Sequence, residues 1–207
     1  MTASTSPIQP IRYAFLLLSN YSMITFSSAV GCLRVANYIS GKSLYEWQAV
    51  TLSGQPVTAS NGLAVTPVIA SDGLNLGNLE ALIICGGTMI DQAYDQNALK
   101  WLKKLANSKI NLGSMCTGSY LLASSGLLDG YHCTIHWEHL ASMREAFPNI
   151  MMSSKLFAID RDRFTCSGGN ASIDMMLQLI SKQQGGQFTA AISEMLILER
   201  IRDHHDT

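Results

Sequence analysis

The residue of this sequence best placed to do chemistry is Cys116, in the stretch "LGSMCTGSYLLASSG". An apolar run ends at Met115 and a helix-like run follows Gly118, so the cysteine occupies an abrupt turn between a strand and a helix. Such a turn pushes its side chain out over the sheet, and the first N–H groups of the helix can lower the pKa of a thiol there. The pattern leaves three interpretations open: a nucleophile, a redox-sensitive thiol, or a small residue that only packs.

The other cysteines and the histidines form no pattern typical of a metal site. The five cysteines are spread along the chain without a CxxC pair, and His132, His136 and His139 have no carboxylate at a supporting ligand spacing. We therefore expect no metal, no cofactor and no disulfide framework. Reduced thiols are typical of a cytoplasmic protein.

The charge balance argues against a nucleic-acid-binding surface on this chain. The formal net charge is −1, and the grouped cations Lys100, Lys103 and Lys104 fit the solvated face of one helix. The apolar residues 13–18 form too short a run for a signal peptide or a membrane span, so we expect no contact with a membrane.

Apolar runs of strand length alternate with helical patterns along the chain, which predicts an α/β fold around a mostly parallel sheet. Residues 1–10 are expected to form a loose tail and residues 11–202 one domain. Ligands bind at the carboxyl ends of the strands in such sheets, so "CGG" (85–87) and "SMCTG" (114–118) are expected at one edge. The predicted strands are 13–18, 44–52, 79–87, 110–116 and 130–136, with a hairpin over 155–169, and the predicted helices are 23–39, 96–109, 117–126, 137–147, 170–183 and 188–203.

The run over residues 112–137, "LGSMCTGSYLLASSGLLDGYHCTIHW", resembles the class I glutamine amidotransferase-like domains of the ThiJ/PfpI superfamily. It is most similar to the sensor domains at the N-terminus of AraC-family transcription regulators of the GlxA type. The segments "FLLLSNYSMITFSSAVGCLRVAN", "LEALIICGG" and "FTCSGGNASIDMMLQLI" extend the resemblance over most of residues 11–202.

The resemblance implies a three-layer α/β/α, flavodoxin-like sandwich with a mostly parallel sheet. It also implies a cytoplasmic homodimer whose DNA contacts come from a C-terminal helix-turn-helix region absent from this chain. Regulators of this type respond to small nitrogen compounds. The expected partner is therefore a small-molecule effector such as betaine, carnitine or an arginine-like metabolite.

Binding of such an effector would require two kinds of protein group at the sheet edge. Its cation would lie over aromatic faces, and its carboxylate would meet backbone N–H groups at a helix start. Phe26 also fits the apolar stripe of its helix, which favours a core position, whereas Trp137 fits either role and Tyr21 is the strongest aromatic candidate. The candidate ligand-binding residues are Cys116, Thr117, Gly86, Gly87, Tyr21, Asn20, His136, Trp137 and Phe26.

The same site permits a second function, hydrolysis or hydration by the Cys116 thiol with His136 as its partner. Both functions require the Cys116 sulfur to face a cavity at the sheet edge. Superfamily enzymes often supply a carboxylate from the helix after the first strand, yet residues 13–45 contain no Asp or Glu, and Gly31 occupies the expected position. PfpI-type peptidases place histidine directly after the cysteine, where this chain has Thr117. These departures favour a binding domain over an enzyme.

Overall fold

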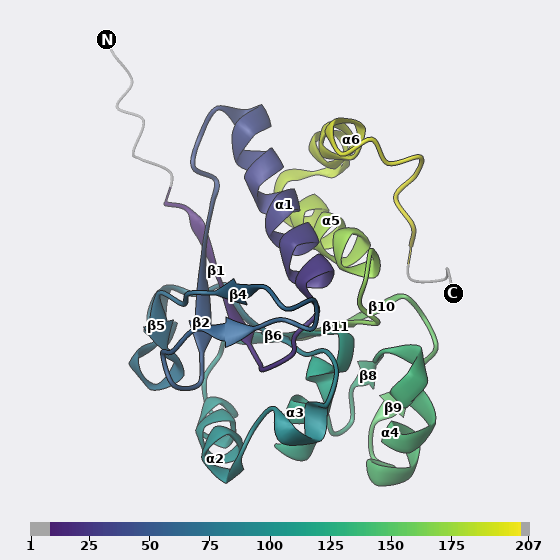
Figure 1. The fold of residues 1–207 in the computed structure, drawn as a ribbon. Helices are drawn as coiled ribbons and strands as arrows, with labels where there is room; N and C mark the ends of the chain where they lie inside the picture. The colour runs from purple at the N-terminus through teal and green to yellow at the C-terminus, as the bar shows by residue number, and fades with distance from the viewer. Residues whose placement is uncertain (1–8, 204–207) are drawn as a thin grey trace.

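The computed structural model describes residues 9–203, in which seven strands form one mostly parallel sheet (Figure 1). Most of the tail expected over residues 1–10 lies outside the described residues. The strand order is β10-β11-β7-β6-β1-β2-β5, and within it the β10–β11 pair is antiparallel. The strands are β1 (Ile11–Leu17), β2 (Tyr45–Thr51), β5 (Ile69–Ala70), β6 (Ala81–Cys85), β7 (Asn111–Met115), β10 (Phe157–Asp160) and β11 (Arg163–Cys166).

The centre of the sheet is apolar because helices cover it on both faces. Every residue of β6 is buried, and this strand lies between β1 and β7 in parallel register. Strands that are buried on both faces lack the alternation of a half-exposed strand and show continuous apolar runs. The same property made "LEALIICGG" recognisable as a strand in the sequence.

Helices pack on both faces of the sheet, which confirms the expected three-layer, flavodoxin-like α/β/α sandwich. Figure 1 shows α1, α5 and α6 on one face and α2, α3 and α4 on the other, and each group buries its own apolar cluster. Among the helices of residues 9–203, none has the length and apolar character needed to cross a membrane. The helices are α1 (Met23–Ser40), α2 (Gln96–Leu105), α3 (Ser119–Ser124), α4 (Leu140–Ala146), α5 (Ala171–Gln184) and α6 (Gly186–Met195).

The segment predicted as a strand over 130–136 does not join the main sheet. Its strand β8 (His132–Cys133) pairs in parallel with β9 (Met151–Met152) in a separate two-stranded sheet. The β10–β11 hairpin takes the place beside β7 instead. A third small sheet joins β3 (Val57–Thr58) to β4 (Ala64–Val65). The apolar pattern of a short run indicates a strand without specifying which sheet it joins.

The last helix is shorter than the predicted 188–203. α6 ends at Met195, and Ile197 adopts a left-handed φ of 55°, which interrupts the helix. Beyond that residue the Arg202 side chain donates to the Asp174 carboxylate of α5 at 2.7 Å. This ion pair holds the end of the described chain against α5. The helical periodicity of a sequence does not predict such a long-range contact.

The carboxyl ends of β6 and β7 lie at one edge of the sheet, as predicted, and the two strands are neighbours there. Cys85 is the register partner of Met115, so the glycines after β6 are adjacent to the turn after β7. An isolated bridge between Tyr21 and Gly87 adds the loop after β1 to the same edge. This edge therefore brings together the segments that carry most of the candidate residues.

Candidate functional site

Cys116 directly follows β7 and has a φ of 57°, a left-handed conformation that non-glycine residues seldom adopt. The turn fits only because glycines border it. A Cβ on Gly86 would lie 2.3 Å from the Gly118 nitrogen, and a Cβ on Gly118 would lie 2.3 Å from the carbonyl oxygen of Ile84. The strained turn expected from the sequence is therefore present, and it is enclosed by the end of β6. We call this turn, residues 115–118, the elbow.

The turn between β11 and α5 covers the cysteine from another side. A Cβ on Gly168, whose φ is 101°, would lie 2.9 Å from the Cβ of Cys116. The next residue, Gly169, donates its N–H to the hydroxyl of Thr25 on α1 at 2.8 Å. Three elements that are distant in the sequence thus converge around the thiol.

This enclosure sets the protonation state of the thiol. Cys116 is only 8% exposed, and burial raises its pKa to about 11. A hydrogen bond from the Thr117 N–H lowers the pKa in part, whereas the negative charge of Glu138 raises it further. The depressed pKa that the helix start suggested is therefore not found, because desolvation outweighs the N–H donor. The thiol is protonated at neutral pH.

His136 borders Cys116 through its backbone. Its N–H donates to the Cys116 carbonyl oxygen at 3.4 Å, while its ring Nδ1 lies 3.6 Å from a carboxylate oxygen of Glu138. Among the hydrogen bonds of residues 9–203, none joins the His136 ring to the Cys116 sulfur. The two side chains expected to cooperate in catalysis are thus neighbours without a direct bond between them.

The loop after β1 is packed tightly against the glycines after β6. The Thr117 hydroxyl donates to the carbonyl oxygen of Gly87 at 2.7 Å, and Ser22 donates its N–H to Gly86 at 3.0 Å. A Cβ on Gly87 would lie 2.0 Å from the backbone oxygen of Asn20, which itself has a left-handed φ of 59°. The backbone candidates of the sequence analysis are thereby brought together at one point of the sheet edge.

The three aromatic candidates differ sharply in exposure. Tyr21 is fully buried, with its ring edge-on to Phe26 at 5.9 Å, and Phe26 packs in turn against Phe15. Tyr21 therefore offers no open ring face in this structure, contrary to its ranking from sequence. Trp137 is 73% exposed and lies beside the His136 ring at 5.7 Å. Phe26 is half-buried, so Trp137 is the most exposed of the three rings.

Two residues of the site, Glu138 and Thr25, were not predicted from the sequence. Glu138 acts on the thiol through its charge, and its position two residues after His136 in "IHWEH" could have indicated that it lies near Cys116. Thr25 is the α1 residue that reaches the turn over Cys116, whereas Gly31 lies further along the helix, and a Cβ there would meet no atom within 4 Å. The helix position facing the elbow thus carries a hydroxyl.

Three cavities on the surface of residues 9–203 lie away from the elbow. They measure about 260, 480 and 360 Å³, and none of them is lined by Cys116, His136 or Trp137. The preformed cavity expected over the sulfur is not among them. In the same part of the chain, no group of three His, Cys, Asp or Glu residues is arranged to hold a metal ion.

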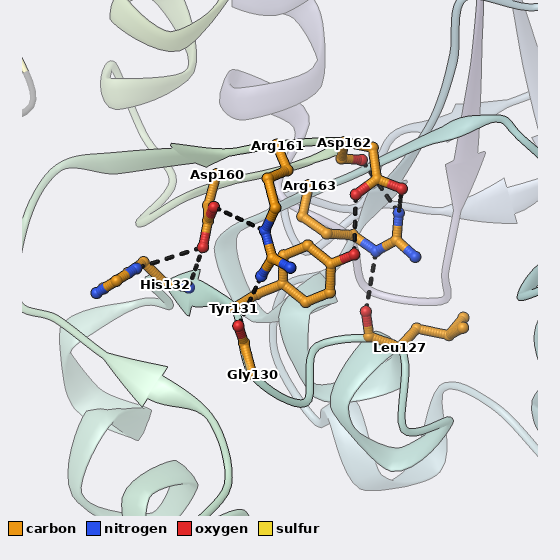
Figure 2. Close-up of polar contacts among 8 residues, drawn as sticks. All are labelled: Leu127, Gly130, Tyr131, His132, Asp160, Arg161, Asp162 and Arg163. Atoms are coloured by element: carbon orange, nitrogen blue, oxygen red, sulfur yellow. Dashed lines mark hydrogen bonds and ion pairs between the residues drawn. The ribbon is translucent and has the colours of Figure 1, made fainter.

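A network of charged side chains fastens the β10–β11 hairpin to the loop after α3 (Figure 2). The Tyr131 ring lies beneath two guanidinium groups, with the Cζ of Arg161 at 3.8 Å and that of Arg163 at 5.0 Å from its centroid. The Tyr131 hydroxyl donates to the Asp162 carboxylate at 2.9 Å. Cation–π contacts and a charge-assisted hydrogen bond thus hold the hairpin tip in place.

Backbone contacts extend this network along the loop. Arg163 donates to the carbonyl oxygen of Leu127 at 2.9 Å, and Arg161 donates to that of Gly130 at 2.6 Å. His132 donates its N–H to the Asp160 carboxylate at 2.8 Å (Figure 2). Because β11 continues directly into the turn over Cys116, these contacts also fix the cover of the elbow.

A model of the DJ-1/PfpI family matches residues 14–182. This chain belongs to the DJ-1/PfpI family. The matched segment contains the elbow, the glycines after β6 and the turn at His136, so the geometry described above belongs to the family domain.

The similar proteins include transcription regulators. The HTH-type transcriptional regulator GbdR of Pseudomonas aeruginosa is 48% identical over 197 residues, which cover 95% of this chain and 53% of that protein. The HTH-type transcriptional regulator CdhR of the same species is 41% identical over 192 residues, which cover 93% of this chain and 56% of that protein. A crystal structure of an AraC family transcriptional regulator from Pseudomonas putida has a TM-score of 0.83 at 30% identity, covering 90% of this chain and 100% of its own. The chain thus spans about half the length of these curated relatives, and its similarity to AraC-type regulators is confirmed.

Proposed function

We propose that this chain is the ligand-sensing domain of an AraC-type DNA-binding regulator and that it binds a small nitrogenous metabolite. The observation that carries the proposal is the 48% identity to a transcription regulator across 95% of the chain. In the whole protein, DNA would be contacted by a helix-turn-helix region beyond the present chain, in a cytoplasmic homodimer. The scattered charge of this chain, with a net value of −1, fits that division of labour.

The effector would bind at the sheet edge around Cys116, with its cation over the exposed ring of Trp137. Such a contact contributes about 0.5–2 kcal/mol, and the Glu138 carboxylate beside it complements the positive charge. The effector carboxylate would meet backbone N–H groups near Gly86, Gly87 and Thr117, in the manner of anions at helix starts. None of the three cavities described above is lined by Cys116, so this proposal includes an opening of the His136–Trp137 turn when the effector binds.

Three features favour binding over catalysis. The Cys116 thiol has a raised pKa of about 11, so little thiolate nucleophile is present at neutral pH. The His136 ring forms a contact with Glu138 and none with the sulfur among the contacts of the described chain. The α1 residue facing the elbow is Thr25, which supplies no carboxylate. A hydrolase or hydratase that uses Cys116 and His136 is the alternative function.

Calorimetric titration and thermal denaturation with betaine, carnitine and arginine test the proposal. Ligand at about one hundred times its Kd should add about 2.7 kcal/mol to the free energy of unfolding. The matched control ligand is 3,3-dimethylbutyrate, which replaces the trimethylammonium group of betaine with an uncharged tert-butyl group of the same shape. Equal binding of betaine and this analogue, or no binding of any of the three nitrogen compounds, would contradict the proposal.

Two variants test whether the cation of the effector binds at Trp137 and Glu138. Trp137→Ala should weaken binding about tenfold because it removes the ring face, and Glu138→Gln should weaken it about two- to fivefold. Glu145→Gln on α4, an exposed carboxylate of the neighbouring helix, is the matched control and should leave the Kd unchanged. If the control variant weakens binding as much as Glu138→Gln, the effect is a general one of net charge and the assignment to Glu138 is wrong.

The alternative function has its own test. Purified protein is assayed with model esters, amides and isonitriles, alongside Cys116→Ala. Turnover that disappears in the variant would establish the enzyme and overturn the proposal. Effector binding that survives in Cys116→Ser would show that the thiol is not the recognition element.

A further inference from the structure

The largest of the three cavities is a groove of about 480 Å³ along β10, the border strand of the sheet. Both faces of this strand contribute to it: Phe157 and Ile159 pack toward the cluster of α1 and α5, and Asp160 turns toward β8. Figure 1 shows β10 between α5 and the β8–β9 segment. The groove has the volume of a small-molecule site. Its lining includes Ser153, Lys155, Phe157, Ile159, Gln178 and Lys182.

Two cations line this groove from different elements. Lys155 precedes β10, and Lys182 lies on α5 one turn after Gln178. No carboxylate of residues 9–203 forms an ion pair with either lysine. Both ammonium groups are therefore available to an anion.

One carboxylate also lines the groove, and its oxygens are already engaged. Asp160 accepts the His132 N–H at 2.8 Å and the Arg161 guanidinium at 3.1 Å, as Figure 2 shows. Its negative charge is thus compensated from the side of the hairpin tip. Lys155 and Lys182 are therefore the lining charges that have no counter-charge among the described residues.

A residue that lines the groove carries a buried hydroxyl without a partner among the described residues. The Ser153 backbone is satisfied, because its N–H donates to Cys133 at 2.9 Å and its carbonyl oxygen accepts from the Thr134 hydroxyl at 3.1 Å. The Ser153 Oγ is buried and has no hydrogen-bond partner among the described residues. Buried polar groups are almost always hydrogen-bonded, and Ser153 lines the groove, so its hydroxyl is a candidate donor to a bound group.

We propose that the β10 groove binds a small organic oxyanion, a carboxylate or phosphate monoester on a compact apolar body. Lys155 and Lys182 hold its charge, the Ser153 hydroxyl and the Gln178 amide donate to its oxygens, and the apolar body lies along β10 near Phe157 and Ile159. This site is independent of the effector site at Cys116. Lysines at a sheet border also hinder the addition of a further strand, but that role does not account for the unpaired hydroxyl.

Titration followed by ¹⁵N–¹H NMR tests the groove with three ligands of one shape: phenyl phosphate, benzoate and uncharged benzamide. The anions should shift resonances of residues 153–160 and 178–182, and benzamide should bind at least about tenfold more weakly. The difference between phenyl phosphate and benzoate identifies the preferred oxyanion. Shifts confined to the elbow around Cys116 would report the effector site instead and would overturn this proposal.

Variants supply the controls. The double variant Lys155→Gln and Lys182→Gln should weaken anion binding about tenfold, whereas the matched pair Lys100→Gln and Lys103→Gln on α2 should leave it unchanged. Ser153→Ala should fold normally, because its hydroxyl has no partner to lose, and should still weaken binding. Equal affinity for benzamide and benzoate, or equal affinity in the two double variants, would overturn the proposal.

Discussion

At the scale of single residues, the elbow shows how one backbone conformation constrains its neighbours. Cys116 takes a left-handed φ, and the chain can pass the end of β6 only where side chains are absent. Gly86, Gly87 and Gly118 therefore act as spacers: each would place a Cβ within 2.3 Å of a backbone atom. Glycine is needed there for close approach of two backbones, since none of the three has a positive φ.

This spacing predicts opposite effects for two glycine substitutions. Gly87→Ala should destabilise the fold by about 1–3 kcal/mol or more, because its Cβ would meet the Asn20 carbonyl oxygen at 2.0 Å. Gly31→Ala, in the middle of α1 with no atom within 4 Å, should stabilise it by about 0.5–1 kcal/mol. Urea denaturation of both variants measures the difference. A Gly87→Ala protein as stable as the parent would contradict the packing described here.

At the scale of elements, the β10–β11 hairpin depends on contacts with the loop after α3. The Tyr131 ring beneath Arg161 and its hydroxyl on Asp162 join two segments that are far apart in the sequence. Since β11 leads into the turn over Cys116, the loop after α3 indirectly positions the cover of the thiol. The hairpin also provides one wall of the β10 groove.

Two substitutions distinguish the contribution of the Tyr131 hydroxyl to stability from that of its ring. Tyr131→Phe should cost about 1 kcal/mol of stability through the lost hydrogen bond to Asp162. Tyr131→Leu should cost a further 0.5–1 kcal/mol, roughly, because the cation–π contact is lost as well. Tyr38→Phe, whose side chain is 70% exposed on α1, is the control and should have no effect. Urea denaturation tests the order, and equal stability of all three variants would show that the network does not hold the hairpin.

At the scale of the whole molecule, the sandwich buries all five thiols and several phenols. Burial raises the pKa of Cys32, Cys133 and Cys166 to about 12 each, above the ordinary value for a thiol. Tyr21 and Tyr45 are raised to about 12 for the same reason. At alkaline pH the buried thiols and phenols of the folded state therefore keep protons that the same groups release in the unfolded chain.

This difference in pKa predicts alkaline destabilisation. Above about pH 8.5 the unfolded thiols ionise first, so the unfolded state binds fewer protons and the free energy of unfolding falls as pH rises. Between pH 8 and pH 10 the loss should be about 2 kcal/mol for each buried thiol. Urea denaturation across that range is the measurement. Cys116→Ser, which removes one titrating group, should show a smaller loss, and a stability that is constant up to pH 10 would contradict the burial of the thiols.

The sequence by itself determined the elements and the position of the elbow. Alternating apolar and helical patterns, with glycines beside Cys116, fix local conformation through sterics and burial, which depend on neighbouring residues. The parallel sheet predicted from these patterns placed the segments at 85–87 and 114–118 on one edge, and "LGSMCTGSYLLASSG" carried the family resemblance. The sheet joined by residues 130–136 and the end of the last helix were not predictable, because contacts such as Arg202 with Asp174 are long-range.

Only the tertiary structure decided the chemistry of the site. A thiol's pKa depends on every group that excludes water from it, and here Gly168 and Glu138, from other elements, surround Cys116. The same holds for Tyr21, the strongest aromatic candidate in the sequence, whose ring is buried against Phe26. The β10 groove likewise exists only because β10, α5 and the β8–β9 segment meet in space. Local sequence specifies backbone turns, whereas protonation, exposure and cavities are properties of the surroundings that folding assembles.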